Sequence, residues 1–438
     1  GHIWTDGRWF RDEKGRVVLL RGAQIIEQRY PYLSWHEPED FDRLLEWGFF
    51  VIRLGTVWAA VEPERGIYDD DYLAALAERI EWCRERGIYV ILDMHQDEYA
   101  EKYGGDGAPE WACLDDGIPH EIVYPWFLNY FSPAVMRAFD NFWRNKDGVQ
   151  DAFIAMWQHV VEYFKDEPAV IGYDLLNEPF FGTSMPAYCH PYGFDYQYLQ
   201  PFYERLIAAI REVDSKRICF FEPNILKGGG LPSFIGRMGF DNIAFAPHYY
   251  EPSTSLFSYY DLNRARIEEN MRLLEEECER MGVAWWMGEF GMFNADTTNG
   301  EQYMRDVLDV LDAHFASWNY WEYDRGGGMH LLNPDYTETK WVDMLVRPYP
   351  VATAGVPLSL SFDPDTKLFT YTYREDANAE GPTVLFVPMR HYPEGFLVEC
   401  SDPDGSWSYS WDEGSQLIEI YVNRDIEEHT ITIEPQRR

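Results

Sequence analysis

The sequence is poor in positive charge and has no long apolar run. Lys and Arg number 37 against 75 Asp and Glu, which gives a formal net charge of −38. A chain this acidic is not expected to bind nucleic acid or to be drawn to anionic membranes. No stretch of about 18 or more apolar residues occurs, so no membrane-spanning helix and no stable membrane insertion is expected.

Cysteine is also scarce. The six cysteines include no Cys-x-x-Cys pair, which argues against a zinc or redox motif of that type. Free thiols are the expected state. A bond between Cys113 and Cys189 is the alternative, because both lie in loops after adjacent predicted strands. The first residues, from Gly1, show neither a signal-peptide pattern nor an initiator Met, so a secreted and a cytoplasmic location both stay open.

Aromatic residues, in contrast, are abundant. They make up 17% of the chain, with 17 Trp and 30 Tyr. A large aromatic core is one interpretation, and a cleft whose aromatic faces stack on sugar rings is the other. With 438 residues, the chain can bury a large core and is long enough for a barrel and a small second domain.

Apolar runs alternate with amphipathic stretches over residues 1–346, which is typical of a parallel β/α architecture. Most of the runs are continuous, as expected for strands buried on both faces. Their number predicts an α/β fold, a (β/α)8 TIM barrel. The eight predicted strands are Val17–Ile25, Phe49–Gly55, Tyr89–His95, Val170–Glu178, Ile218–Glu222, Asn242–Tyr250, Ala284–Phe290 and Phe315–Trp321.

The pattern changes after about Val346. Short alternating runs separated by Asp, Gly and Asn turns follow, which predicts an antiparallel β-sandwich domain over residues 347–438. A stabilising cap and a sugar-binding module are both possible roles for it. The predicted strands are Leu358–Phe362, Leu368–Tyr373, Thr383–Val387, Phe396–Cys400, Ser406–Trp411, Leu417–Val422 and His429–Ile433.

Two glutamates each close an apolar run. One run leads into Asn177-Glu178-Pro179, and another leads into Glu289. The C-terminal strand ends of a β/α barrel carry its chemistry, and two carboxyls there suit a glycosidase. We predict Glu178 as the general acid/base, Glu289 as the nucleophile and Asn177 as the partner of the sugar 2-hydroxyl. Strands four and seven lie across the barrel mouth, which suits the carboxyl separation of about 5 Å of a retaining enzyme.

Polar and aromatic residues end four more of the predicted strands. They are Arg53 on strand two, His95 on strand three, His248 and Tyr250 on strand six, and Trp321 on strand eight. Arg53 would keep the nucleophile ionised, Tyr250 would hydrogen-bond the same carboxylate, and Trp321 would lie under the sugar ring. Each of them could instead be a structural residue at a strand end.

A zinc site is the competing hypothesis for these strand ends. His95, Asp97 and His248 are residue types that bind zinc in barrel hydrolases. Because the two glutamates account for the chemistry without a metal, neither a metal nor a cofactor is expected.

The arrangement resembles a known family. In this order on these strands, the candidate residues resemble those of glycoside hydrolase family 5. The segment Asp93-Met94-His95-Gln96-Asp97 followed by Gly104-Gly105-Asp106-Gly107-Ala108-Pro109 is more closely similar to the endoglycoceramidases of that family. The resemblance extends over nearly the whole chain.

The resemblance implies a retaining hydrolase that cuts between the reducing-end sugar of a glycosphingolipid and ceramide and releases an intact oligosaccharide. Glu178 and Glu289 match the family's acid/base and nucleophile. Residues that match those holding the first sugar are His95, Asp97, Asn177, Tyr250 and Trp321. The family often has a sugar-contacting Lys after its first strand. Here Gln24, Glu27 or Gln28 would face the sugar instead, so glucose and galactose both stay open as the first sugar.

Three other functions stay open. The chain could be a β-glucosidase or glucosylceramidase, or a β-galactosylceramide-specific enzyme, that removes a single sugar from a lipid or aryl aglycone. It could be a cellulase-type endoglucanase, or a sugar- or lipid-binding protein without activity. The apolar segment Tyr124–Phe131 is expected either to pack on the barrel or to be exposed to ceramide. The chain is expected to be a monomer.

Overall fold

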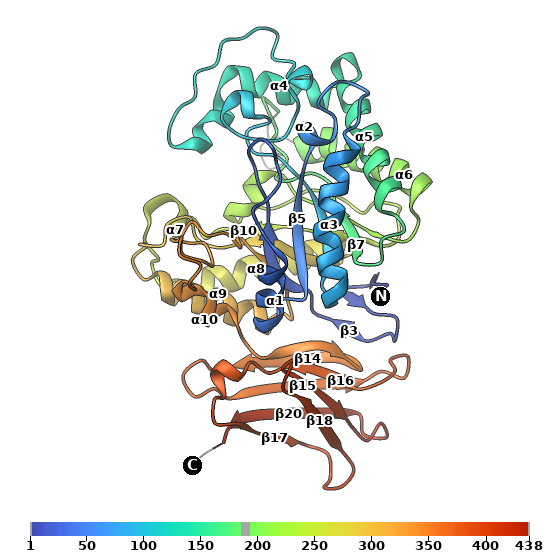
Figure 1. Ribbon diagram of the computed structural model, residues 1–438, viewed down its shortest axis with the longest axis vertical. Helices are drawn as coiled ribbons and strands as arrows, with labels where there is room; N and C mark the ends of the chain where they lie inside the picture. The colour runs from blue at the N-terminus through green and yellow to red at the C-terminus, as the bar shows by residue number, and fades with distance from the viewer. Residues whose placement is uncertain (1, 185–192, 437–438) are drawn as a thin grey trace.

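The chain forms a closed parallel barrel followed by antiparallel strands (Figure 1). The computed structural model describes residues 2–184 and 193–436. The barrel strands are hydrogen-bonded in the order β10-β11-β12-β4-β5-β6-β7-β8-β9, and pairing of β11 with β9 closes the ring. The predicted fold class is therefore confirmed. The barrel strands are β4 (Arg21–Ile25), β5 (Val51–Val57), β6 (Tyr89–His95), β7 (Val170–Asp174), β8 (Ile218–Phe221), β9 (Ile243–Phe245), β10 (His248–Tyr249), β11 (Ala284–Phe290) and β12 (Ser317–Tyr320).

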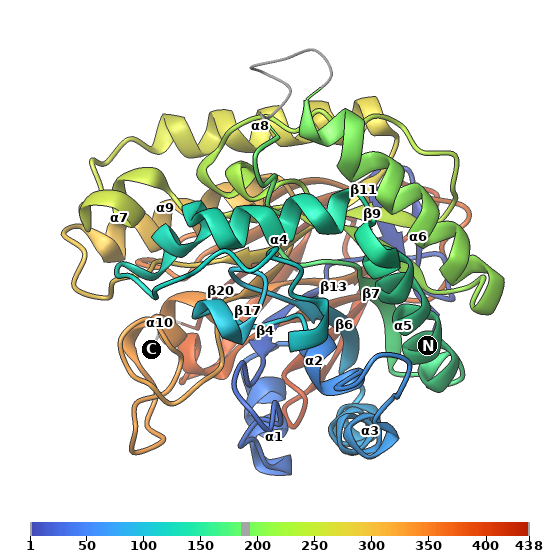
Figure 2. The ribbon, with the colours of Figure 1, turned by 90° about the horizontal axis from the view of Figure 1, so that it is seen from above.

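Helices surround the barrel (Figure 2), and local sequence signals fix several of their ends. Helix α3 begins after Asp69, whose side chain accepts hydrogen bonds from the N–H groups of Asp71 and Tyr72. It ends at Gly87, and α8 ends at Gly282, both with positive φ. The helices are α1 (Pro38–Glu46), α2 (Trp58–Val61), α3 (Asp70–Arg86), α4 (Pro133–Trp143), α5 (Val149–Phe164), α6 (Gln200–Val213), α7 (Pro252–Phe257), α8 (Arg264–Met281), α9 (Gly300–Ala313) and α10 (Lys340–Leu345).

The remaining strands form two sheets below the barrel in Figure 1. One has the order β1-β2-β3-β13-β16-β19-β18, and the other has the order β14-β15-β20-β17. All seven strands predicted for this region are present. The strands are β1 (Trp4–Asp6), β2 (Trp9–Arg11), β3 (Val17–Val18), β13 (Tyr349–Thr353), β14 (Gly355–Phe362), β15 (Phe369–Glu375), β16 (Thr383–Phe386), β17 (Phe396–Cys400), β18 (Ser408–Asp412), β19 (Leu417–Tyr421) and β20 (Glu428–Pro435).

The prediction of one continuous strand over Val17–Ile25 is wrong. Val17 and Val18 pair with β13, whereas Arg21–Ile25 pairs with β5 and β12 in the barrel. A continuous buried apolar run does not reveal which neighbour each half will pair with. The N-terminal strands therefore share a sheet with strands of the C-terminal region, although the last strand, β20, lies in the other sheet. The boundary predicted between residues 346 and 347 stays a prediction.

The N-terminal strands also close the bottom of the barrel. Ile3, Phe10 and Val18 are buried in a cluster with side chains from inside the barrel, including Phe220 and Trp286. The rings of Phe10 and Phe220 lie 6.0 Å apart. Apolar side chains fill this end of the barrel. The polar residues at the C-terminal strand ends lie at the opposite, open end.

Two further expectations concern cysteines and membrane helices. Cys113 is buried and free, and Cys189 lies outside the described residues. Among the residues that the structure describes, no helix has the length and apolar character needed to cross a bilayer.

Candidate active site

A pocket of about 400 Å³ opens at the C-terminal ends of the barrel strands. Six of the predicted site residues line it: His95, Asp97, Glu178, Tyr250, Glu289 and Trp321. The other three, Arg53, Asn177 and His248, are buried among these side chains. The structure thus brings all nine residues together, while their individual roles stay predictions. No residue beyond Asp324 in the described part of the chain lines this pocket.

The two glutamates face each other across His248. The Nδ1 atom of His248 lies 3.0 Å from Oε2 of Glu178 and 3.6 Å from Oε2 of Glu289. One oxygen of each carboxyl lies within 4.8 Å of the other. This spacing is close to the separation of about 5 Å at which one carboxyl attacks a sugar while the other protonates the leaving group.

Glu178 occupies a strained and largely buried position, with its side chain 16% exposed. Its φ is +40°, a conformation that few residues other than glycine adopt, and its N–H donates to Glu222 Oε2 at 2.7 Å. Burial raises the pKa of Glu178 to about 7, although the hydrogen bond with His248 acts in the opposite direction. A carboxyl with this pKa can give and take a proton near neutral pH.

Glu289 has a different environment. Arg53 Nη1 donates to its Oε2 at 2.8 Å, and the Tyr250 hydroxyl donates to its Oε1 at 2.7 Å. Both oxygens therefore accept strong hydrogen bonds that favour a carboxylate anion. The two glutamates are unequal in the way that separates a proton donor from a nucleophile.

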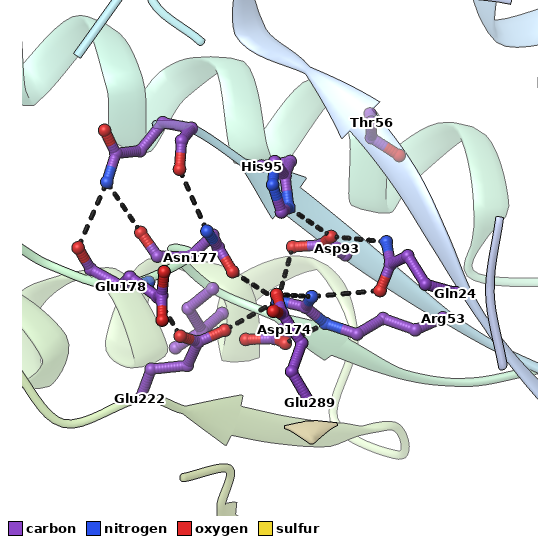
Figure 3. A network of polar contacts seen from close by, with 12 residues as sticks. Gln24, Arg53, Thr56, Asp93, His95, Asp174, Asn177, Glu178, Glu222 and Glu289 are labelled. Carbon is purple, nitrogen blue, oxygen red and sulfur yellow. Dashed lines mark hydrogen bonds and ion pairs between the residues drawn. The ribbon is translucent and has the colours of Figure 1, made fainter. Parts of the chain in front are cut away.

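Arg53 is the centre of a larger buried network (Figure 3). Its Nε donates to Asp174 at 2.8 Å, and its Nη2 donates to Asp93, Asn177 and Glu222 at 2.7–2.8 Å. Burial would raise the pKa of Asp93, but Arg53 and His95 lower it below its usual value. One guanidinium thus holds groups that extend from several strands at the same end of the barrel.

His95 and Trp321 form one wall of the pocket. Their rings are stacked with centroids 5.3 Å apart. The ring nitrogens of His95 lie 2.7 Å from Asp93 Oδ2 and 3.2 Å from Asp97 Oδ2. Burial would lower the pKa of His95, but the two carboxylates raise it well above its usual value. Both nitrogens can therefore donate, which fixes the ring against Trp321.

The structure explains the paired sequence motif around Asp97 and Asp106. These residues form an isolated antiparallel bridge, with backbone hydrogen bonds of 3.1 and 2.9 Å. A Cβ atom on Gly105 would lie 1.7 Å from the carbonyl oxygen of Asp97, so only glycine permits this approach. Gln28 Nε2 then donates to both aspartates, at 2.9 and 2.8 Å.

The three candidates for the position of the family's Lys have different environments. Gln28 and Glu27 line the pocket. Gln24 is fully buried, donates to Asp93 at 2.9 Å and accepts from Arg53 at 3.0 Å. Glu27 and Gln28 therefore face the pocket, as predicted for one of the three, whereas Gln24 does not.

Several groups of carboxylates and histidines lie close enough together to ligate a metal ion. His95 and Asp97 group with Asp106, while His248 groups with Glu178 and Glu289. The zinc site proposed as an alternative, with His95, Asp97 and His248 around one ion, is not among the groups found in the described residues.

Three carboxylates of the network, Asp93, Asp174 and Glu222, were not predicted as site residues. Glu222 directly follows β8, and it closes an apolar run as Glu178 and Glu289 do, so the same signal could have identified it. Asp174 is the last residue of β7 inside an apolar run, and no local pattern distinguishes it. Burial and the neighbouring Glu222 raise the pKa of Asp174 well above its usual value.

Comparisons with known proteins agree along the whole chain. The family model described as cellulase (glycosyl hydrolase family 5) matches residues 12–327, and the glycoside hydrolase family 5 C-terminal domain matches residues 347–433. Endoglycoceramidase I of Rhodococcus hoagii (strain 103S) is 32% identical over 447 residues, which cover 96% of this chain and 88% of that protein.

Two solved structures of endo-glycoceramidase II from Rhodococcus sp. are similar throughout. Its complex with ganglioside GM3 has a TM-score of 0.89 at 30% identity, covering 99% of this chain and 100% of that one. Its lactosyl-enzyme intermediate has a TM-score of 0.87 at 30% identity and full coverage of both chains.

The Arg53 network gives a prediction about stability. Replacing Arg53 with Met should lower the free energy of unfolding at pH 7 by about 3–5 kcal/mol, because it leaves buried carboxylates without their shared cation. In the native protein Asp93 contributes stability above its unfolded pKa of about 4, since its folded pKa is lower. The loss should therefore persist down to about pH 4 and shrink as the pH falls further, as urea denaturation at several pH values can measure.

Arg144 is the matched control, because it is an exposed arginine. Arg144→Met should change the free energy of unfolding by less than about 0.5 kcal/mol at any of these pH values. Similar small losses in the two variants would show that the network contributes little to stability.

Proposed function

The chain belongs to glycoside hydrolase family 5, and we propose that it is a retaining hydrolase of glycosphingolipids. It cleaves the β-glycosidic bond between the reducing-end sugar and ceramide and releases the intact oligosaccharide. The observation that carries this proposal is the pair Glu178 and Glu289, with oxygens within 4.8 Å of each other and unequal surroundings. The similar endo-glycoceramidase II, with its GM3 complex and lactosyl-enzyme intermediate, supports it.

The reaction takes two steps. In the first, Glu289 attacks the anomeric carbon, Glu178 gives its proton to the ceramide oxygen, and the bond between sugar and ceramide breaks. This leaves a glycosyl ester on Glu289. In the second, Glu178 takes a proton from water, the water oxygen attacks the anomeric carbon, and the ester bond to Glu289 breaks. Two inversions give net retention.

The surroundings of the two carboxyls suit these steps. Arg53 and Tyr250 hold Glu289 as an anion and orient it. As Glu289 loses its charge in the first step, Glu178 more easily becomes an anion, because like charges close together disfavour one another. We assign Trp321 to the floor under the first sugar and His95 and Asp97 to its hydroxyls, since these three line the same pocket. We place Asn177 at the 2-hydroxyl, because it directly precedes Glu178.

We assign the catalytic unit to residues 1–346 and a supporting role to residues 347–438. The second region packs at the end of the barrel away from the pocket. Tyr349 donates to the carbonyl of Gly48 at 2.6 Å, and Phe386 fills the space beside Gly48. Gly48 precedes β5, so this contact supports the strand that carries Arg53.

The apolar segment Tyr124–Phe131 is exposed except at Asn129 and Tyr130, which are buried, and this favours the second of the two expectations for it. Tyr124 and Phe131 are 84% and 55% exposed, and Trp126, Phe127 and Leu128 are each at least 40% exposed. Trp126 also lines the pocket. We infer that this segment contacts the lipid part of the substrate, because exposed apolar side chains beside a site mark a surface for an apolar partner.

One experiment tests the reaction. Lactosylceramide should yield lactose and ceramide, with the β-anomer of lactose formed first, as proton NMR and mass spectrometry can detect. Glu289→Ala should lower the rate by at least about 10⁴-fold, and azide should restore product as α-lactosyl azide, because azide attacks from the side that Glu289 has vacated. Release of a single sugar from lactosylceramide would indicate an exo-glycosidase, and near-normal activity of Glu289→Ala would show that the nucleophile is another residue.

The pKa of Glu178 predicts the pH dependence. The first step needs its protonated form, so kcat/KM for lactosylceramide should fall about tenfold per pH unit above a midpoint near 7. A lactoside with a dinitrophenyl leaving group is the control, because such a group departs without a proton. Its kcat/KM should stay level through the same range. An equal fall with both substrates would assign the pH dependence to another group.

The exposed segment predicts a substrate-dependent effect. Tyr124→Ser combined with Phe127→Ser should lower the rate on micellar lactosylceramide by about tenfold, since two apolar anchors are lost, and should spare a soluble aryl lactoside. Tyr409→Ser combined with Tyr421→Ser is the control, because both are half-exposed on the C-terminal strands, and it should change neither rate. Equal losses on both substrates would point to a packing role.

A further inference from the structure

The pocket is unusually rich in acid, even for this acidic chain. Two basic side chains, Arg29 and His95, face it. Eight carboxyl side chains face it as well: Glu27, Asp97, Glu98, Asp106, Glu178, Glu289, Glu322 and Asp324. A glycan that enters this pocket therefore meets mainly oxygen acceptors.

The innermost charges balance one another. Arg53, His95 and His248 are cations, because neighbouring carboxylates raise the pKa of both histidines despite their burial. Arg53 and His95 lie 2.7–2.8 Å from carboxylate oxygens of Asp93, Glu222 and Glu289, and His248 lies 3.3 Å from Glu222 and 3.6 Å from Glu289. Three cations therefore offset three anions below the first sugar, and none of these cations has charge to spare for an anionic ligand.

The outer wall of the pocket, formed by Glu27, Glu98, Asp106, Glu322 and Asp324, has no such balance of charge. In the part of the chain that the structure describes, Glu27, Glu98, Asp106 and Asp324 form no ion pair within 4.0 Å. Burial raises the pKa of Glu98 to about 7, and burial and Asp97 raise that of Asp106 well above its usual value. Asp106 is 2% exposed, and its Oδ1 has no hydrogen-bond partner.

Arg29 compensates this charge only in part, because it lowers the pKa of Glu98 and Asp106 less than burial raises it. Its guanidinium donates to the backbone carbonyl oxygens of Gly104 and Gly105, and the residue is exposed at the rim. His330 lies 3.4 Å from Glu322, but burial lowers the pKa of His330, so it is neutral at pH 7. The wall thus presents incompletely compensated carboxylates and protonated carboxyls.

Sugar hydroxyls suit this wall. Each hydroxyl donates one hydrogen bond and accepts others, so carboxylates accept from it and protonated carboxyls donate to it. A carboxylate on the glycan would be repelled by the ionised acids and would lose water without gaining a cation. The wall therefore favours neutral glycans over anionic ones.

We propose that the outer wall of Glu27, Glu98, Asp106, Glu322 and Asp324 makes this enzyme selective for neutral glycosphingolipids over sialylated ones. The proposal rests on the proposed function and specifies its substrate class. It sets this chain apart from the similar endo-glycoceramidase II, whose structure has been solved with ganglioside GM3.

The test compares three lipids in dilute mixed micelles of one non-ionic detergent. They are lactosylceramide, GM3, which carries one additional sialic acid, and GM3 with its sialic acid carboxylate methylated. We expect kcat/KM for lactosylceramide to exceed that for GM3 by at least about tenfold in about 0.01 M NaCl and to approach it in about 0.5 M NaCl, because salt screens the repulsion. The methyl ester, equal in size to GM3 but uncharged, should be cleaved within about threefold of lactosylceramide.

Two variants separate the local wall from the charge of the whole protein. Glu27→Gln should reduce the preference for lactosylceramide over GM3 by about threefold, because it removes a charge that faces the glycan. Glu413→Gln makes the same change at an exposed site in the turn between β18 and β19 and should leave the preference unaltered. Equal effects of the two variants would overturn the proposal, because the selectivity would then reflect overall charge.

The outcomes also separate this inference from the proposed function. Equal cleavage of lactosylceramide and GM3 would overturn the selectivity and leave the reaction standing. A methyl ester as poor as GM3 would overturn it as well, since size would then be the cause. Cleavage of none of the three lipids would overturn the proposed function, and the selectivity with it.

Discussion

The buried guanidinium of Arg53 is the interaction on which the active end of the barrel depends. From one position on β5 it donates to groups carried by or directly following β4, β6, β7, β8 and β11. Its planar fork fixes directions as well as distances. Any sliding of one strand would break hydrogen bonds of this buried cation, so Glu178 and Glu289 keep a set spacing without being bonded to each other.

The sequence located the proposed catalytic pair for a simple physical reason. In a parallel barrel every strand ends at the same rim, so a carboxyl that closes an apolar run is brought to that rim whatever lies between. Glu178 and Glu289 are found in this way, and Glu222 could have been. Asp174 could not, because a fully buried strand has no alternation to show which side chains point into the barrel. The resemblance to known enzymes supplied Asp97, whose position depends on its bridge to Asp106.

The pairing of strands that lie far apart in the chain could not be predicted from the sequence. The apolar run from Val17 to Ile25 is equally compatible with one strand and with two, and the choice depends on β13, more than 300 residues further along. The exposure of Tyr124–Phe131 was undecided for a related reason, since an apolar loop is stabilised equally by a barrel surface and by a lipid. The composition shows that the protein is acidic, but only the folded structure shows that carboxyl groups without a paired cation line the pocket.

The shared sheet has a consequence for the order in which the molecule can form. Residues 4–18 leave the ribosome more than 300 residues before their sheet partner β13 and the strands that follow it in the same sheet. The bottom of the barrel, which Phe10 helps to fill, can therefore reach its final packing only after these later strands have been made. Until then a nascent barrel exposes an apolar end, and the late strands complete the fold of the catalytic part as well as their own.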